Sequence, residues 1–293
     1  MPRAELRFEA IGAPWQIDTP DPLPPTLVDA IHARIDEYDR TWSRFRSDSL
    51  VARVATEPGN WAFPSDAPPL FDLYRALYDA SGGTVTPLVG RRLENLGYDA
   101  DYSLRPAPTR VEVPAWDDVM SWDGSTLTTR VPVVLDVGAA GKGYLVDIVA
   151  AMLRDAGIED YTVDGSGDLV HAGGEPLRVA LEHPFDPTLA IGIYELSDGA
   201  LCASAPGRRA WGTGLHHILD GLTGEPTTDV AATWAMASSG LVADGLATAL
   251  FFVDGDTLAT ALPPGPEYEF EYVRMFPTSR VEHSPGFRGE LFT

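Results

Sequence analysis

One segment in the middle of the chain constrains the fold more than any other. A short apolar run at residues 131–137 is followed by a glycine-rich turn at residues 138–143. Apolar residues then recur every three to four positions through residues 145–156, and Gly157 is placed to end a helix there. A further apolar run starts at residues 161–163. We therefore expect a buried strand, a tight turn, an amphipathic helix and a second strand in succession.

The rest of the chain alternates helical and strand-like patterns. Apolar spacing predicts helices over residues 27–45, 69–80 and 239–253, and strands over residues 177–181, 190–196, 233–236 and 267–272. Short strands joined by turns indicate mixed α and β structure with substantial antiparallel content.

Composition narrows the class of protein. In 293 residues, a hydrophobic fraction of 44% is enough for a sizeable core. The net charge of −22 argues against nucleic acid and anionic membranes as partners, because both repel an acidic surface. Cys202 is the only cysteine, which excludes an internal disulfide and suits a reducing compartment. The first ten residues contain no apolar signal region, and no apolar run is long enough to span a bilayer. We therefore expect a cytoplasmic protein without a membrane partner.

The glycine turn is the first candidate site. A glycine turn at the start of a helix exposes N–H groups and the positive end of the helix dipole, which suits a phosphate. Lys142 would add a mobile cation, and Asp136 could hold a ribose hydroxyl or a metal-bound water. The glycine spacing matches neither a dinucleotide fingerprint nor a Walker A loop. A plain tight turn with a solvated lysine is the alternative.

The second candidate is the pair Asp244 and Thr248. Their spacing of four places both oxygens on one face of the predicted helix. A carboxylate and a hydroxyl form a partial shell for Mg²⁺, which substrate phosphates and water usually complete. The alternative is that Asp244 favours the helix dipole while Thr248 bonds back to a carbonyl.

The third candidate is the histidine pair His216 and His217. A histidine at a strand end is a candidate general base near neutral pH. Neighbours in a strand point to opposite faces, so only one of the two should serve a given site. The alternative for either is an ordinary surface or capping histidine.

The order of these pieces resembles the ApbE family, the FAD:protein FMN transferases, over nearly the whole chain. The turn with Asp136, Lys142 and Asp147 resembles the family's Asp-Leu-Gly-Gly-Ile-Ala-Lys-Gly-x-x-x-Asp. The segments that resemble other family motifs are residues 8–13, 45–49, 83–87, 164–168, 217–224 and 243–249. Each match alone is modest, but five in the right order make coincidence an unsatisfactory explanation.

The resemblance implies roles for individual residues. Asp244 and Thr248 would bind Mg²⁺, together with a backbone carbonyl of the turn between Ala139 and Gly141. His217 rather than His216 would be the catalytic histidine, with Asp244 as the other candidate base. The residues implied to contact FAD are Asp136 and Lys142, with Thr84, Val85 and Thr86 lining the flavin and Ile11 near it.

The resemblance also implies a fold and a reaction. The fold would be a single α+β domain over residues 1–293, with two mixed α/β halves and antiparallel sheets around a ligand cleft. The reaction would be Mg²⁺-dependent transfer of the FMN moiety of FAD to a Thr or Ser hydroxyl of an acceptor flavoprotein, with release of AMP. Two alternatives stay open: an FAD pyrophosphatase, and a non-catalytic FAD-binding module, which the altered loop at residues 84–86 favours.

Overall fold

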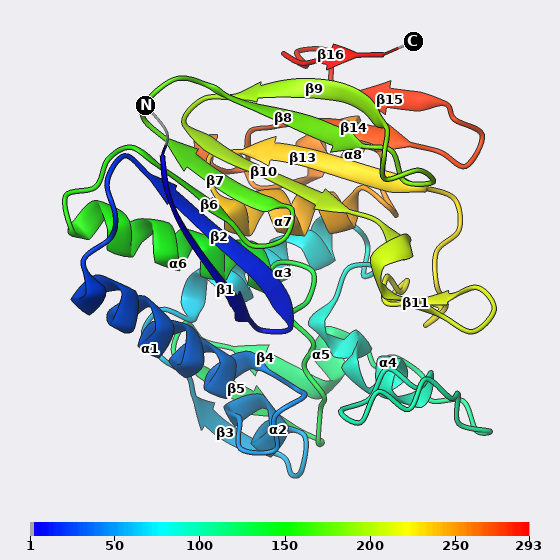
Figure 1. The fold of residues 1–293 in the computed structure, drawn as a ribbon. Coiled ribbons are helices and arrows are strands. Elements are labelled where there is room, and N and C mark those ends of the chain that lie inside the picture. Colours follow the sequence, from blue (N-terminus) through cyan, green and yellow to red (C-terminus); the bar gives the residue numbers. More distant parts are fainter. Residues whose placement is uncertain (1–2, 293) are drawn as a thin grey trace.

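The largest element of the structure is an eight-stranded sheet (Figure 1). The computed structural model describes residues 3–292. Every neighbouring pair of strands in this sheet is antiparallel, as expected from the sequence. In sheet order, the strands are β1 (Ala4–Ala10), β2 (Ala13–Thr19), β6 (Tyr161–Asp164), β7 (Asp168–Ala172), β10 (Gly199–Ser204), β13 (Ala232–Ala237), β14 (Phe270–Met275) and β15 (Val281–His283).

The longer helices lie on one side of this sheet (Figure 1). They are α1 (Pro25–Trp42), α3 (Pro68–Ala80), α6 (Gly141–Asp155) and α7 (Gly240–Ala249). Helix α6 contacts β6 and β7, and α7 contacts β7, β10 and β13. Helix α1 packs on α6, and α3 packs on α7, so the two form the next layer outward. Within residues 3–292, no helix combines the length and the apolar character needed to cross a membrane.

Smaller elements surround this framework. Two three-stranded sheets have the orders β3-β5-β4 and β16-β9-β8, and β11 pairs with β12 in a hairpin. Their strands are β3 (Gly59–Ala62), β4 (Met120–Trp122), β5 (Thr126–Thr129), β8 (Leu177–Glu182), β9 (Ala190–Leu196), β11 (Ala210–Trp211), β12 (Leu215–His216) and β16 (Glu290–Leu291). The short helices are α2 (Leu50–Val54), η1 (Pro87–Val89), α4 (Gly90–Asn95), α5 (Trp116–Val119), η2 (Pro206–Arg209), α8 (Gly255–Ala261) and η3 (Pro266–Tyr268).

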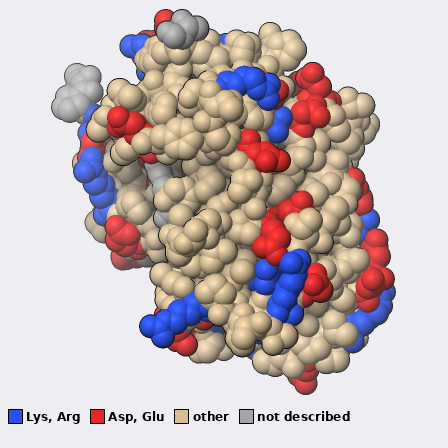
Figure 2. Space-filling view, turned by 90° about the vertical axis from the view of Figure 1, so that its right-hand side faces the viewer, with Lys and Arg blue, Asp and Glu red and all other residues tan. Residues whose placement is uncertain are grey.

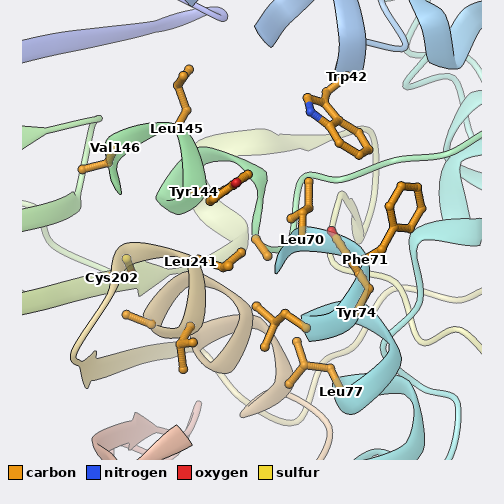
Figure 3. Close-up of a cluster of buried hydrophobic side chains, with 14 of the residues drawn as sticks. Trp42, Leu70, Phe71, Tyr74, Leu77, Tyr144, Leu145, Val146, Cys202 and Leu241 are labelled. Carbon is orange, nitrogen blue, oxygen red and sulfur yellow. The ribbon is translucent and has the colours of Figure 1, made fainter. Parts of the chain in front are cut away.

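Helix α7 is buried because its sequence is apolar all round. Apart from Asp244 and Thr248, each of its residues is glycine or hydrophobic, and such a helix belongs inside a core. Side chains from α3, α6 and α7 meet in one cluster (Figure 3). Ser239 caps the helix by accepting a hydrogen bond from Val242 N–H. The core therefore fixes α7, and its only two polar side chains share one face.

A second cap for α7 comes from α6. The Asp147 carboxylate accepts hydrogen bonds from Gly240 N–H at 2.7 Å and from Leu241 N–H at 2.8 Å. Burial raises the pKa of Asp147 to about 6, although these two hydrogen bonds oppose that rise. The two helices are thus joined through the start of α7.

The backbones of α6 and α7 touch at two glycines. A Cβ atom at Gly143 would lie 2.1 Å from the carbonyl oxygen of Gly240, and one at Gly240 would lie 2.5 Å from the carbonyl oxygen of Gly143. Only glycine at both positions permits this approach. As a result, Gly143 N–H donates a hydrogen bond of 2.9 Å to Oδ2 of Asp244.

Most elements expected from the sequence are confirmed. The helices predicted over residues 27–45, 69–80 and 239–253 are α1, α3 and α7, and the strands predicted over residues 177–181, 190–196 and 233–236 are β8, β9 and β13. Residues 267–272 divide between η3 and the start of β14, so the strand begins at Phe270 instead.

The strand predicted over residues 131–137 is wrong. Val133, Val134 and Leu135 are buried, as a core strand would be, but the segment joins no sheet. Asp136 N–H donates to the carbonyl oxygen of Pro87, in η1, and not to a neighbouring strand. An apolar run indicates that a segment is buried. A buried segment can pack against the core without pairing with a neighbouring strand.

The helix that follows starts earlier than expected. Gly141 N–H donates to the carbonyl oxygen of Val137 at 2.7 Å, so Gly141, Lys142 and Gly143 form the first turn of α6. The tight turn itself is confined to residues 138–140. This shift aims the first N–H groups of α6 toward α7.

Charged side chains of both signs are mixed on one face of the molecule. On the face shown in Figure 2, Asp and Glu are scattered among Lys, Arg and uncharged residues. The positive side chains on that face do not gather into one broad patch of the kind that a phosphate backbone favours.

The glycine contact predicts that Gly143→Ala destabilises the protein. The added methyl group would meet the backbone of Gly240 and Cβ of Asp244, which lies 2.6 Å from its position. Forcing extra atoms into a packed core costs about 1–3 kcal/mol, and a backbone obstacle places this site at or above that range. Urea denaturation should show the loss. Gly286→Ala is the matched control, because nothing lies within 4 Å of its added Cβ. Equal midpoint urea concentrations for unfolding of the two variants would contradict the prediction.

Candidate functional site

The structure brings the sequence-predicted site residues to the wall of one cavity. Its volume is about 1100 Å³. The predicted residues that line it are Ile11, Thr84, Val85, Thr86, Asp136, Ala139, Gly141, Lys142, His217, Asp244 and Thr248. They come from the β1–β2 hairpin, the loop after α3, the start of α6, the β12 end and helix α7. Residues far apart in sequence therefore converge here.

Oxygen atoms gather where α7 meets the turn before α6. Thr248 Oγ1 donates a hydrogen bond of 3.3 Å to the carbonyl oxygen of Ala139. Asp244 is 6% exposed, and only its Oδ2 is hydrogen-bonded within the described residues, to Gly143 N–H. The carboxylate, the hydroxyl and the backbone carbonyl thus lie along one edge of the cavity.

Two tyrosines hold the turn in place. The Tyr38 hydroxyl donates to the carbonyl oxygen of Gly141 at 2.7 Å, and the Tyr74 hydroxyl accepts from Ala139 N–H at 3.2 Å. Both rings are buried in the core between the helices. The orientation of the turn is therefore set by α1 and α3, and the sequence motif itself supplies neither tyrosine.

Lys142 is not the mobile cation that we expected. Its ammonium group forms an ion pair with Asp168 and donates a hydrogen bond of 2.6 Å to the carbonyl oxygen of Gly165. Burial lowers the pKa of Lys142, but the charges of Asp168 and Asp244 outweigh burial and raise it. Lys142 is thus a fixed positive charge between two carboxylates.

Asp168 is a site residue that the sequence reasoning did not single out. It is 1% exposed, it lines the cavity, and neither carboxylate oxygen makes a hydrogen bond of good geometry within the described residues. Burial and the charge of Asp168 raise the pKa of Asp244 well above its usual range, while Lys142 and Gly143 N–H oppose the rise. Asp168 and Asp244 are thus two buried carboxyl groups on either side of one cation, Lys142, which is paired with Asp168.

This charge pattern fits a divalent cation. Asp244, Thr248 and the turn carbonyls offer only oxygen donors, which Mg²⁺ prefers. Within residues 3–292, no group of three or more His, Cys, Asp or Glu side chains is arranged to hold a metal, so a cation here would depend on one carboxylate, a hydroxyl and backbone carbonyls. A cation beside Asp244 would also relieve its repulsion with Asp168.

Asp136 is engaged by the protein itself. Its Oδ2 accepts from Arg44 Nε at 2.6 Å and its Oδ1 accepts from Gly138 N–H at 2.8 Å. Burial raises the pKa of Asp136, but Arg44 and the Gly138 hydrogen bond more than compensate, so the pKa is lowered. Asp136 therefore fixes the turn, while part of its side chain faces the cavity.

The two histidines face different surroundings. Nε2 of His216 lies 2.7 Å from the carbonyl oxygen of Thr227, and its Nδ1 accepts from Ile218 N–H. His217 lines the cavity, and its Nδ1 has no partner of good geometry within the described residues. Burial, followed by the positive charge of Arg209, lowers the pKa of His217 to about 3. The ring is therefore neutral at physiological pH.

The loop after α3 is rigid and largely buried. Val85 is 3% exposed, and Val85 N–H donates to Ser81 Oγ at 3.0 Å. Gly221 N–H, in the segment after His217, donates to the carbonyl oxygen of Thr84 at 2.8 Å. This hydrogen bond couples the loop to the histidine segment.

Ile11 lies at the tip of the β1–β2 hairpin. Its backbone φ is 47°, a strained value for a β-branched residue.

Aromatic side chains form a further wall that sequence reasoning missed. The rings of Tyr98 and Trp211 stack with centroids 5.3 Å apart, and those of Phe45 and Tyr102 do the same at 5.3 Å. The Arg44 guanidinium lies 4.2 Å from the Phe45 ring centroid. These residues lie on unrelated segments, so no local pattern in the sequence could have grouped them.

Known proteins share this sequence pattern and this fold. The sequence model of the ApbE family matches residues 11–265. A curated relative, the FAD:protein FMN transferase of Vibrio cholerae serotype O1, is 28% identical over 242 residues, which cover 77% of this chain and 72% of the relative.

Solved structures agree at the level of the fold. The flavin transferase ApbE from Vibrio cholerae superimposes with a TM-score of 0.82 at 23% identity, covering 98% of each chain. The ApbE protein from Thermotoga maritima also gives a TM-score of 0.82 at 23% identity, covering 97% of each chain. Because the family model spans most of the sequence, this chain belongs to the ApbE family.

Proposed function

We propose that this protein transfers the FMN moiety of FAD to a Thr or Ser hydroxyl of an acceptor flavoprotein, in a Mg²⁺-dependent reaction that releases AMP. Family membership and the name of the Vibrio cholerae relative support the transfer of FMN. The observation that carries the proposal is the meeting of Asp244, Thr248 and His217 at one cavity of about 1100 Å³. Because segments spread between Ile11 and Phe252 line that cavity, and β14 and β15 extend the same central sheet, we also propose that residues 1–293 act as one domain.

Mg²⁺ would be held by Asp244, Thr248 and the carbonyl oxygens of Ala139 and Gly141. Bound there, it would neutralise charge on the phosphoryl oxygens and stabilise the departing AMP. Lys142 keeps Asp168 paired, which leaves Asp244 as the carboxylate available to the cation. The hydrogen bond from Gly143 N–H orients the Asp244 carboxylate before the metal binds.

FAD would lie along the cavity with its pyrophosphate near the start of α6. The positive end of the α6 helix dipole and the fixed charge of Lys142 favour negative charge there. Thr84, Val85 and Thr86 would line the flavin, with Ile11 at its edge, and Asp136 would contact the dinucleotide from the turn. The lining of the cavity by these residues and the burial of the loop support this placement.

His217 is suited to remove a proton. Its neutral ring can accept the proton of the acceptor hydroxyl as that oxygen attacks the phosphorus nearer riboflavin. A new phosphorus–oxygen bond then forms to the acceptor, while the bond to the AMP phosphate breaks and AMP leaves with the electron pair. Asp244 is the other candidate base, but its proposed role beside the metal competes with proton transfer.

Co-expression tests the overall proposal. The protein and candidate flavoproteins would be produced together, and intact mass spectrometry of each flavoprotein would reveal an added FMN. A parallel incubation of the protein with FAD and Mg²⁺ alone distinguishes the alternatives. Rapid release of AMP and free FMN without an acceptor would identify a pyrophosphatase, and FAD binding without AMP release in either assay would identify a binding module.

Replacement of Asp244 should abolish transfer. Asp244→Asn keeps the shape of the side chain but removes the charge that a divalent cation needs. We expect no detectable FMN transfer, together with retained folding by circular dichroism. Thr248→Val should reduce the rate less, because a neutral hydroxyl is the weaker ligand. Asp79→Asn, at an exposed ion pair on α3, is the control. Wild-type transfer by Asp244→Asn in Mg²⁺ buffer would refute the metal assignment.

The two histidines should behave differently when replaced. His217→Ala should lower the transfer rate by roughly 10²–10⁴, the usual contribution of a positioned acid–base group. FAD affinity should survive, because a base acts in the transition state. His216→Ala should leave the rate nearly unchanged, since that ring bonds the backbone around Thr227. Initial rates measure the effect on transfer, and fluorescence titration measures the affinity for FAD. A large loss of transfer rate in His216→Ala would show that His216, and not His217, is the base.

The environment of His217 also predicts a pH dependence of stability. The unfolded ring binds a proton near its ordinary pKa of about 6.5, whereas the folded ring does so only near 3. The unfolded state therefore holds more protons between these values, and the free energy of unfolding falls as pH drops through that window. His217→Ala should lose less stability than the wild type between pH 7 and pH 4.5 in urea titrations. His283→Ala, at an exposed histidine, should follow the wild type.

A further inference from the structure

The β11–β12 hairpin brings Arg209 and His217 to the wall of the same cavity. Ala210 pairs with His216 and Trp211 pairs with Leu215 in this antiparallel ladder. Arg209, the last residue of η2, comes directly before the first of these strands, and His217 directly follows the second, so the two residues flank the Ala210–His216 pair. Both residues line the cavity.

Arg209 is the cavity cation that keeps its hydrogen-bond donors free. Among the side chains that the structure describes, its guanidinium has no ion pair and no hydrogen bond. The other described cations in the lining are engaged: Lys142 with Asp168, Arg44 with Asp136, and Arg46 with Asp39 and Asp48. A free, half-buried guanidinium beside buried carboxylates is available for an anionic ligand.

The positive charge of Arg209 acts across the cavity. After burial, it is the largest cause of the lowered pKa of His217; it also adds to the lowering of the Asp136 pKa by Arg44, and it opposes the rise of the Asp244 pKa that burial and Asp168 produce. The titratable and charged groups that bear on the His217 ring are Arg209 and His216 from its own hairpin and Asp136 from the turn before α6. Arg209 is therefore close enough to affect both the proposed base and the edge of the cavity near the turn.

We propose that Arg209 is a catalytic residue that binds the phosphoryl group being transferred, on the side facing His217. This inference rests on the proposed function. The planar guanidinium donates two hydrogen bonds to phosphoryl oxygens and stabilises the charge that builds up as the acceptor oxygen bonds to phosphorus. The proton leaves the hydroxyl for His217, and the bond to AMP breaks with its electron pair on AMP. Arg209 neither gains nor loses a proton.

The arrangement explains how a base and a phosphate can share one wall. A phosphate alone would favour the protonated imidazole, which cannot act as a base. The guanidinium between them balances that negative charge and preserves the neutral ring. Arg209 thereby performs two tasks with one charge: it positions the reacting phosphorus and keeps His217 able to accept a proton.

Three variants test the proposal: Arg209→Ala, Arg209→Lys and, as a control, Arg91→Ala at an exposed ion pair on α4. With an acceptor identified by co-expression, Arg209→Ala should lower kcat/KM for FMN transfer by about 10²–10³-fold, as loss of one transition-state donor does. Arg209→Lys should recover part of that rate, because it restores the charge but not the two-pronged geometry. Arg91→Ala should match the wild type.

Two further measurements do not depend on turnover. Titration of the His217 ring by NMR, assigned with His217→Gln, should show a higher pKa in Arg209→Ala and a wild-type pKa in Arg209→Lys. Affinity for inorganic pyrophosphate, measured calorimetrically, should fall in Arg209→Ala. A purely structural role for Arg209 would produce neither the NMR shift nor its rescue by lysine.

The outcomes separate this inference from the proposed function. If the wild type transfers FMN while Arg209→Ala has the same kcat/KM and the same His217 titration, the role of Arg209 is refuted and the function stands. If the wild type transfers no FMN, the function fails, and unchanged pyrophosphate affinity in Arg209→Ala would then refute the phosphate site independently. Lower affinity together with the NMR shift would support the phosphate site in either case.

Discussion

The close approach of α6 and α7 is the constraint on which the site depends. Gly143 and Gly240 let two backbones touch, and any side chain at either position would separate them. Through this contact Gly143 N–H reaches Asp244, and Asp147 reaches the start of α7. One packing interaction therefore sets the position of the proposed metal ligand and the direction of the helix that carries it. A buried carboxylate is tolerated there because the contact also supplies its hydrogen bond.

Charge inside the cavity is arranged differently from charge on the surface. The chain carries a net charge of −22, yet Arg44, Lys142 and Arg209 all line the cavity. Two of these cations are paired with Asp136 and Asp168, so they hold the scaffold more than they attract a ligand. Buried pairs of this kind contribute little net stability, but removal of one partner is costly. They keep the turn and the start of α6 rigid while Asp244 and Arg209 remain available.

The sequence selected residues that the fold brings to one cavity, but it mispredicted part of the local structure around them. The residues chosen from motifs all line one cavity, although residues 131–137 form no strand and Lys142 is not free. An apolar run indicates burial. Strands are buried, but so are extended segments that pack against the core without pairing in a sheet. Asp168 lies in a segment that matched a family motif, but its ion pair with Lys142 had no local signal, and neither did Arg209 or the Tyr98–Trp211 stack, because the groups that meet lie far apart in the sequence.

The sequence by itself determined which helices form and which face of α7 carries oxygen atoms, since both follow from spacing along one element. It also determined the family, because several motifs occur in a fixed order. Only the tertiary structure decided which charges are paired, which tyrosines hold the turn, and that Arg209 and His217 line the same cavity. The physical reason is distance: periodicity acts over a few residues, whereas burial, desolvation and ion pairing depend on segments that only the folded chain brings together.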